Sequence, residues 1–148
     1  MTKGLEGLDN AVHQTHAWIN DLDSRLGWEN KPRAFRLLKT ALHELRDHLP
    51  VNESAHLAAQ LPTLLRGVFY DQWKPATNPV KDRTAETMLD HVRHAFRTDP
   101  LIDPEGAVGA VFALLAEKVS PGEIAQVRQS LPPQVRALWP EPAKTSAG

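Results

Sequence analysis

The chain has 148 residues, a formal net charge of -1 and no cysteine. Disulfides, thiolate metal sites and cysteine nucleophiles are therefore excluded, and no global charge attracts nucleic acid, a membrane surface or an acidic substrate. With 41% hydrophobic and 24% charged residues, the composition is that of a globular chain that can bury its own core. Because an apolar leader is also absent, we expect a cytoplasmic protein.

Four helices are predicted in the first half of the chain. Apolar residues recur at steps of three and four over residues 8–26, which defines one face of a helix, and Gly27 follows as a left-handed cap. Cap residues and prolines then delimit a second long helix and two short ones. These three helices are expected over residues 30–49, 52–61 and 62–70.

The second half repeats this order after a proline-containing loop at residues 71–82. Helical spacing resumes over residues 88–96, and a second helix begins at Asp103, where a cap residue precedes proline. Ser120 to Glu123 reads as a capping box that opens a third helix, which Pro132 interrupts. No segment alternates with the period of a strand, so the fold class is all-α.

An internal repeat relates the two halves. Displaced by 70 residues, they align without a gap, with Leu61-Pro62 on Leu131-Pro132 and apolar positions on apolar positions. We interpret the chain as a helical bundle of two pseudo-symmetric units, residues 8–73 and 82–140, each with two longer and two short helices. One domain over residues 1–140 is favoured over two marginal ones. Residues 141–148 are expected to form a disordered tail.

Two charged residues are identical in both copies. Glu53 and Arg66 in the first unit correspond to Glu123 and Arg136 in the second. We hypothesise that each glutamate forms an ion pair with the arginine of its own unit, fixing the angle between the two short helices.

The segment Leu61-Pro62-Thr63-Leu64-Leu65-Arg66-Gly67-Val68-Phe69-Tyr70-Asp71-Gln72-Trp73-Lys74-Pro75 resembles the bacterial domain-of-unknown-function family 2267. Ala17-Trp18-Ile19, Gly122-Glu123-Ile124 and Leu131-Pro132 are similar to it as well, so the resemblance covers roughly residues 14–140. It implies a fold of two related halves with Leu-Pro in each. It implies no activity and no catalytic residue.

Motifs for metal binding and catalysis are weak. His13 and His16, like His91 and His94, are three residues apart and share a helix face, as helical metal ligands do. The zinc-protease spacing, the serine elbow and a phosphate-binding glycine loop are missing. We also reject a di-iron bundle, which needs inward glutamates and Glu-x-x-His motifs from four helices. The sequence predicts no catalytic residue, no cofactor and no metal.

A basic stripe runs beside the apolar face of the second helix. Arg36, Lys39, His43 and Arg46 follow one another at steps of three and four. The stripe is either a solvated face or a contact for phosphates or an acidic partner. Because no aromatic residues interleave with it, nucleic acid is the less favoured partner.

Three aromatic residues are specific to the first unit. Trp28, Tyr70 and Trp73 align with Thr98, Pro140 and Ala143, so the repeated fold does not demand aromatic side chains there. They either pin a loop to the body or anchor a binding surface, for which tyrosine and tryptophan are typical.

Two hypotheses for function follow. The first is a non-enzymatic interaction module, whose protein partner would meet Trp28, Tyr70 and Trp73 or the basic stripe. The alternative is a small-ligand or metal-binding protein that uses a groove between the two units and the histidines. An exposed aromatic patch would favour the first, and a deep pocket with histidines from both halves the second. Membrane insertion is not expected, and the sequence leaves the oligomeric state open.

Overall fold

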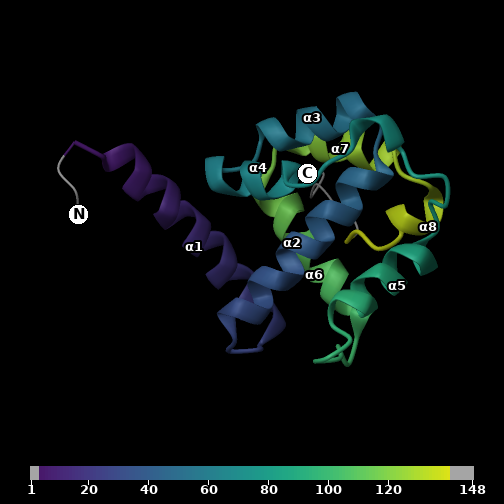
Figure 1. Ribbon diagram of the computed structural model, residues 1–148, viewed down its shortest axis with the longest axis horizontal. Coiled ribbons are helices and arrows are strands. Elements are labelled where there is room, and N and C mark those ends of the chain that lie inside the picture. Colours follow the sequence, from purple (N-terminus) through teal and green to yellow (C-terminus); the bar gives the residue numbers. More distant parts are fainter. Residues whose placement is uncertain (1–3, 141–148) are drawn as a thin grey trace, which may run out of the picture.

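The computed structural model describes residues 4–140, and within them every regular element is a helix (Figure 1). The predicted tail at residues 141–148 lies outside this range. The elements are α1 (Glu6–Leu26), α2 (Lys31–His48), α3 (Val51–Ala59), α4 (Thr63–Tyr70), the 3-10 turn η1 (Pro75–Thr77), α5 (Ala85–Ala95), α6 (Pro104–Lys118), α7 (Pro121–Gln129) and α8 (Pro133–Arg136). The all-α prediction is confirmed.

Most predicted helix ends are confirmed by the caps. Gly27 closes α1 at φ 67°, and the Asn30 side chain accepts a hydrogen bond from the Arg33 backbone N–H at the start of α2. Asp103 caps α6 in the same way. Helix α3 begins at Val51, one residue before the predicted start at residue 52, immediately after a proline whose fixed φ suits this position.

The two arginines shared by the halves bind backbone carbonyls. Nε of Arg66 donates to the Ala58 carbonyl at 3.0 Å, and Nε of Arg136 donates to the Arg128 carbonyl at 2.8 Å. Each arginine thereby adds a side-chain donor to a carbonyl in the last turn of the preceding short helix, which also accepts a backbone N–H from Leu61 or Leu131. Among the residues described, neither forms an ion pair with Glu53 or Glu123, so the hypothesis of paired arginines and glutamates is wrong.

The core forms around α2 and α6, which pack against each other and against the other long helices. Its largest fully buried side chains include Phe69, Phe96 and Phe112. Phe112 stacks on Trp139 with ring centroids 4.4 Å apart, which ties the C-terminal segment to α6. Apolar residues from both halves therefore share one core cluster.

The first short helix of one half packs on its counterpart in the other. Helices α3 and α7 lie side by side and contact each other (Figure 1). Their bounds, Val51–Ala59 and Pro121–Gln129, correspond at the offset of the predicted repeat. This packing brings Glu53 of α3 close to Glu123 of α7, although the two residues are 70 positions apart in the sequence.

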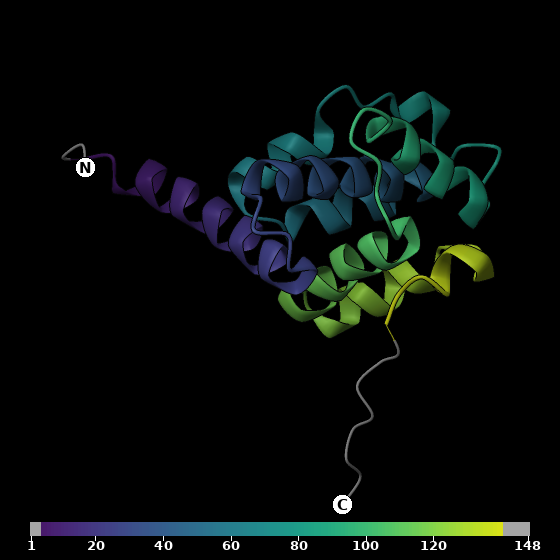
Figure 2. The same cartoon turned by 90° about the horizontal axis from the view of Figure 1, so that it is seen from below.

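Helix α1 extends beyond the body of the molecule (Figures 1 and 2). Its buried residues are Trp18, Leu22 and Asp23, all in its C-terminal half. The N-terminal half points away from the helices that cover the C-terminal half. Across residues 4–140, no helix combines the length and the apolar character that a membrane span requires.

Candidate functional site

The projecting half of α1 and its N-cap residue Leu5 carry an exposed apolar stripe of Leu5, Leu8 and Val12. Their side chains are 44%, 63% and 47% exposed. The stripe lies on the same helix face as Ile19 and Leu22 in the C-terminal half of α1. Leu22 is part of the core, and Ile19 packs against it. The same sequence pattern therefore serves the core at one end of the helix and faces solvent at the other.

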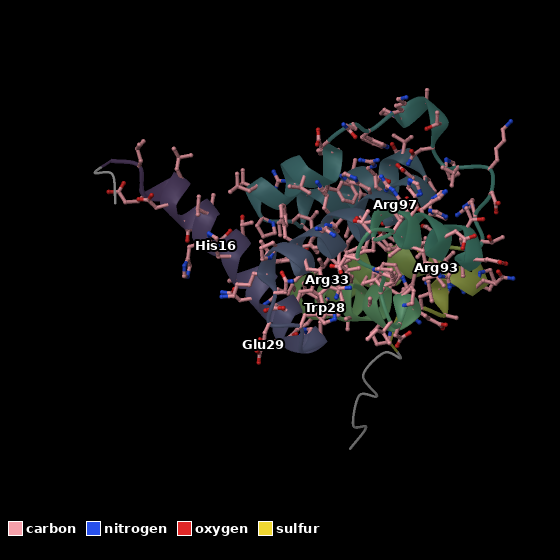
Figure 3. The ribbon with its side chains drawn as sticks, turned by 60° about the horizontal axis from the view of Figure 1, so that its bottom comes forward. His16, Trp28, Glu29, Arg33, Arg93 and Arg97 are labelled. Atoms are coloured by element: carbon pink, nitrogen blue, oxygen red, sulfur yellow. The ribbon has the colours of Figure 1, made fainter. Side chains whose placement is uncertain are left out.

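Trp28 belongs to a cluster at the loop between α1 and α2. The Arg33 guanidinium lies 4.3 Å from the centroid of the Trp28 ring, and the Trp28 ring meets Phe96 edge to face. Figure 3 shows Trp28 and Arg33 next to one another, while His16 extends from α1 away from the body. Arg33 also binds the Asp99 carboxylate at 2.7 Å, so the cluster links the two inter-helix loops.

Tyr70 and Trp73 form a second cluster at the end of α4. Their rings stack with centroids 5.3 Å apart, and Trp73 Nε1 donates to Asn78 Oδ1 at 3.0 Å. Asn78 in turn donates to the carbonyls of Arg46 and Leu49 at the end of α2. Both aromatic side chains are half-buried. Their contacts hold the loop after α4 against the end of α2.

The three aromatic residues do not form one surface. Trp28 contacts the first turn of α2 through Arg33, whereas Trp73 reaches the last turn of α2 through Asn78. About 13 residues of helix, or roughly 20 Å, separate these two turns. The predicted aromatic interaction surface is therefore not assembled.

We expect Trp73→Phe to lower the free energy of unfolding by roughly 1 kcal/mol, because it removes the hydrogen bond to Asn78 and keeps most of the ring. Trp73→Ala should lower it further, by roughly 1–3 kcal/mol, since the stack with Tyr70 is lost as well. Urea titration followed by circular dichroism measures both. If both variants stayed within about 0.5 kcal/mol of the wild type, as ordinary surface substitutions do, Trp73 would not be a structural pin.

The basic stripe is divided between exposed and buried side chains. Arg36 and Lys39 are exposed, in accord with the prediction. Arg46 is only 5% exposed and donates to the carbonyls of Phe69 and Asp71, both at 2.8 Å. Its placement on an interaction surface is therefore wrong, because the guanidinium satisfies carbonyls at the end of α4.

A cavity of about 620 Å³ lies between the α1–α2 loop and the α5–α6 loop. Residues from both halves line it, including Trp28, Arg33 and Asp99. Arg33 is already bound to Asp99 and to the Pro100 carbonyl, and Arg25 is paired with Asp21 and Glu117. The positive groups of this cavity are thus engaged within the protein.

The histidines singled out in the sequence lie elsewhere. His13 and His16 are exposed on α1, and His94 is exposed on α5. His91 Nδ1 lies 2.6 Å from the Glu44 Oε1 atom. None of these four lines the cavity, so the predicted combination of a pocket with histidines from both halves is not formed there.

Two carboxylates meet between α3 and α7. Glu123 is 9% exposed, and burial together with the neighbouring Glu53 raises the pKa of its carboxyl to about 7. The Oε1 atoms of Glu53 and Glu123 are both buried, and neither has a hydrogen-bond partner among the described residues. His56, one turn after Glu53, completes a group whose potential ligand atoms all lie within 4.8 Å of one another.

The predicted capping box at Ser120 is only half formed. Ser120 Oγ accepts from the Glu123 backbone N–H at 3.4 Å, as predicted. The reciprocal contact is replaced, because the Ser120 N–H donates to Gln60 Oε1, which belongs to the first half. The Glu123 side chain is thereby left to face Glu53.

A sequence signal for this cluster exists. Glu53-Ser54-Ala55-His56 is a Glu-x-x-His motif, which places both polar side chains on one helix face. This single motif is short of the set from four helices that a di-iron bundle needs. The contribution of Glu123 follows only from the packing of α3 on α7.

Comparison with known proteins agrees with the resemblance seen in the sequence. The model of a family described as an uncharacterized conserved protein (DUF2267) matches residues 15–138. No curated protein matches the chain. The matched region runs from the middle of α1 to the segment after α8 and so includes both short-helix pairs. The chain therefore belongs to the DUF2267 family.

Proposed function

We propose that this protein is a non-enzymatic, cytoplasmic protein-interaction module and that the stripe of Leu5, Leu8 and Val12 on α1 is its contact surface. The supporting observation is the exposure of these three side chains on the projecting half of the helix. A buried leucine or valine stabilises by roughly 1.5–3 kcal/mol, so a contiguous exposed set of this kind is typical of a surface that a partner covers.

The spacing favours a helical partner. Along the helix face the residues Leu5, Leu8, Val12, Thr15, Ile19, Leu22 and Leu26 follow one another at alternating steps of three and four. This is the heptad pattern of a helix that packs along another helix. The C-terminal half of the pattern already packs against other helices of this chain. We therefore infer that the N-terminal half receives a helix from a partner protein.

The charges beside the stripe favour a basic partner over a second copy. Glu6 and Asp9 lie in the first turn of α1, and the sequence has no lysine or arginine from Glu6 to Ser24. One oxygen of the Asp9 carboxylate is shielded and has no hydrogen-bond partner among the described residues. Two copies would bring acidic helices together, whereas a helix with lysine or arginine beside its apolar face is complementary.

Site-specific photo-crosslinking in the native cell tests this function. A photoreactive residue at position 8 should crosslink a different protein, and the same residue at Gln14, which is exposed on the opposite side of α1, should not. The Leu8→Asp/Val12→Asp variant should remain folded and lose binding to the captured protein, while Gln14→Asp should keep both.

The captured segment must then show the inferred chemistry. Mass spectrometry should place the crosslink on an amphipathic helix with adjacent lysine or arginine, and a synthetic peptide of that helix should bind wild type in fluorescence anisotropy. Binding should weaken as salt is added. A crosslink to α1 of a second copy, equal capture from position 14, or no crosslink at position 8 would each contradict the proposal.

A further inference from the structure

We propose that Glu53, His56 and Glu123 form a binding site for a divalent transition-metal ion between α3 and α7. This site lies away from the projecting half of α1 and is independent of the interaction surface (Figure 1). Its three side chains come from the two halves of the chain, so a bound ion would join the halves.

The first support is the unsatisfied state of the carboxylates. Glu123 is more than nine-tenths buried, and its Oε1 atom lacks a hydrogen-bond partner in the part of the chain described, as does Oε1 of Glu53. A buried carboxylate is normally paired with a cation or held by hydrogen bonds. Here both arginines of these units are engaged with backbone carbonyls and leave the glutamates to each other.

Ligand chemistry gives the second support. Two carboxylate oxygens and one imidazole nitrogen are the donors that zinc and related ions accept, and two negative charges match one divalent cation. Three protein ligands leave one position of a tetrahedral site for water. His56 is exposed at the rim of the cluster, which provides a path of entry from solvent.

The geometry is compatible with modest closure around an ion. The His56 Nδ1 atom lies 3.9 Å from Glu53 Oε2, and the three ligand atoms all lie within 4.8 Å of one another. Ligands about 2.0–2.1 Å from a tetrahedral ion are about 3.3–3.4 Å apart. Rotation of the exposed His56 side chain and small shifts of the two carboxylates would bring the ligand atoms to these distances.

Isothermal titration of chelator-stripped, full-length protein with zinc tests the site. We expect one zinc ion per chain in the wild type, and a loss of affinity of at least about tenfold in both His56→Ala and Glu123→Gln. The control His94→Ala removes an exposed histidine outside the cluster and should bind zinc as the wild type does. Cobalt should give the visible absorption of a four-coordinate ion in the wild type and not in Glu123→Gln.

Thermal unfolding provides a separate readout. Zinc should raise the melting temperature of the wild type and of His94→Ala, and should not raise that of Glu123→Gln or His56→Ala. Circular dichroism confirms that each variant is folded before titration. Failure of folded wild type to bind zinc, unchanged binding in both cluster variants, or loss of binding in His94→Ala would overturn the proposal.

Discussion

In the metal-free protein, Glu123→Gln will be more stable than the wild type at pH 8, and the difference will be much smaller at pH 5. The Glu123 carboxyl has a pKa raised to about 7 by burial and by the Glu53 carboxylate. The folded state therefore binds a proton that the unfolded chain releases near pH 4.5. The binding of this proton stabilises the folded state. The stabilisation is fully present below the pKa of the unfolded chain and is lost as the pH rises through about 7.

The size of this effect follows from the shift. A carboxyl displaced from about 4.5 to about 7 alters the free energy of unfolding by roughly 3 kcal/mol at a pH well above both values. Glutamine keeps the shape of the protonated acid and carries no charge at any pH. The variant therefore does not lose stability when the Glu123 carboxyl of the wild type ionises. Urea titrations at pH 5 and pH 8, with chelator present, measure the difference between variant and wild type.

Other groups also change the stability with pH, but their contributions cancel when Glu123→Gln is compared with the wild type at the same pH. Burial lowers the pKa of His43 and His48, so these residues reduce stability as the pH falls, in the wild type and the variant alike. The exposed Glu86→Gln serves as a matched control and should follow the wild type at both pH values. Equal stability of Glu123→Gln and wild type at pH 8 would show that burial and Glu53 do not raise the pKa of the Glu123 carboxyl in the folded state.

Local signals in the sequence predict the helices well because caps and prolines act within one turn. Gly27, Asn30 and Asp103 end or begin helices where their backbone chemistry indicates. The apolar spacing also identifies core positions such as Leu38 and Phe112. These features depend on neighbours a few residues away, so a single sequence is sufficient to read them.

The candidate sites depend on packing between distant segments, which local patterns do not encode. Glu53 and Arg66 are both repeated, and a pairing within each unit is the nearest interpretation. Arg66 instead donates to a carbonyl in the last turn of α3, and α7 brings Glu123 to Glu53. The sequence likewise does not reveal that Leu8 is exposed, because Leu8 belongs to the same apolar pattern as Leu22, which is buried in the core.

Arg46 shows the same limit, since a basic stripe in the sequence does not reveal which of its members is buried. Besides the two carbonyls at the end of α4, its guanidinium binds the Asp47 carboxylate with Nε at 2.8 Å. The Arg46 carbonyl itself accepts from Ser54 Oγ at 2.8 Å. One residue therefore connects the last turn of α2 to α3 and to the end of α4.

Arg46→Met is expected to lower the free energy of unfolding by roughly 3–5 kcal/mol, because it leaves the carbonyls of Phe69 and Asp71 without their donor and Asp47 without its partner. That is a large share of the roughly 5–15 kcal/mol that stabilises a typical domain. Lys39→Met, an exposed change on the same helix, should stay within about 0.5 kcal/mol of the wild type. Urea titration compares the two.

Arg46→Lys separates the charge from the shape of the guanidinium. A lysine retains the positive charge but cannot reproduce the planar fork that reaches two carbonyls and a carboxylate at once, so we expect a stability between those of wild type and Arg46→Met. A wild-type stability for Arg46→Met would show that these hydrogen bonds contribute nothing net to the stability of the fold. A large loss with both substitutions would instead assign it to the fold, and leave Arg36 and Lys39 as the basic groups of α2 that a partner can reach.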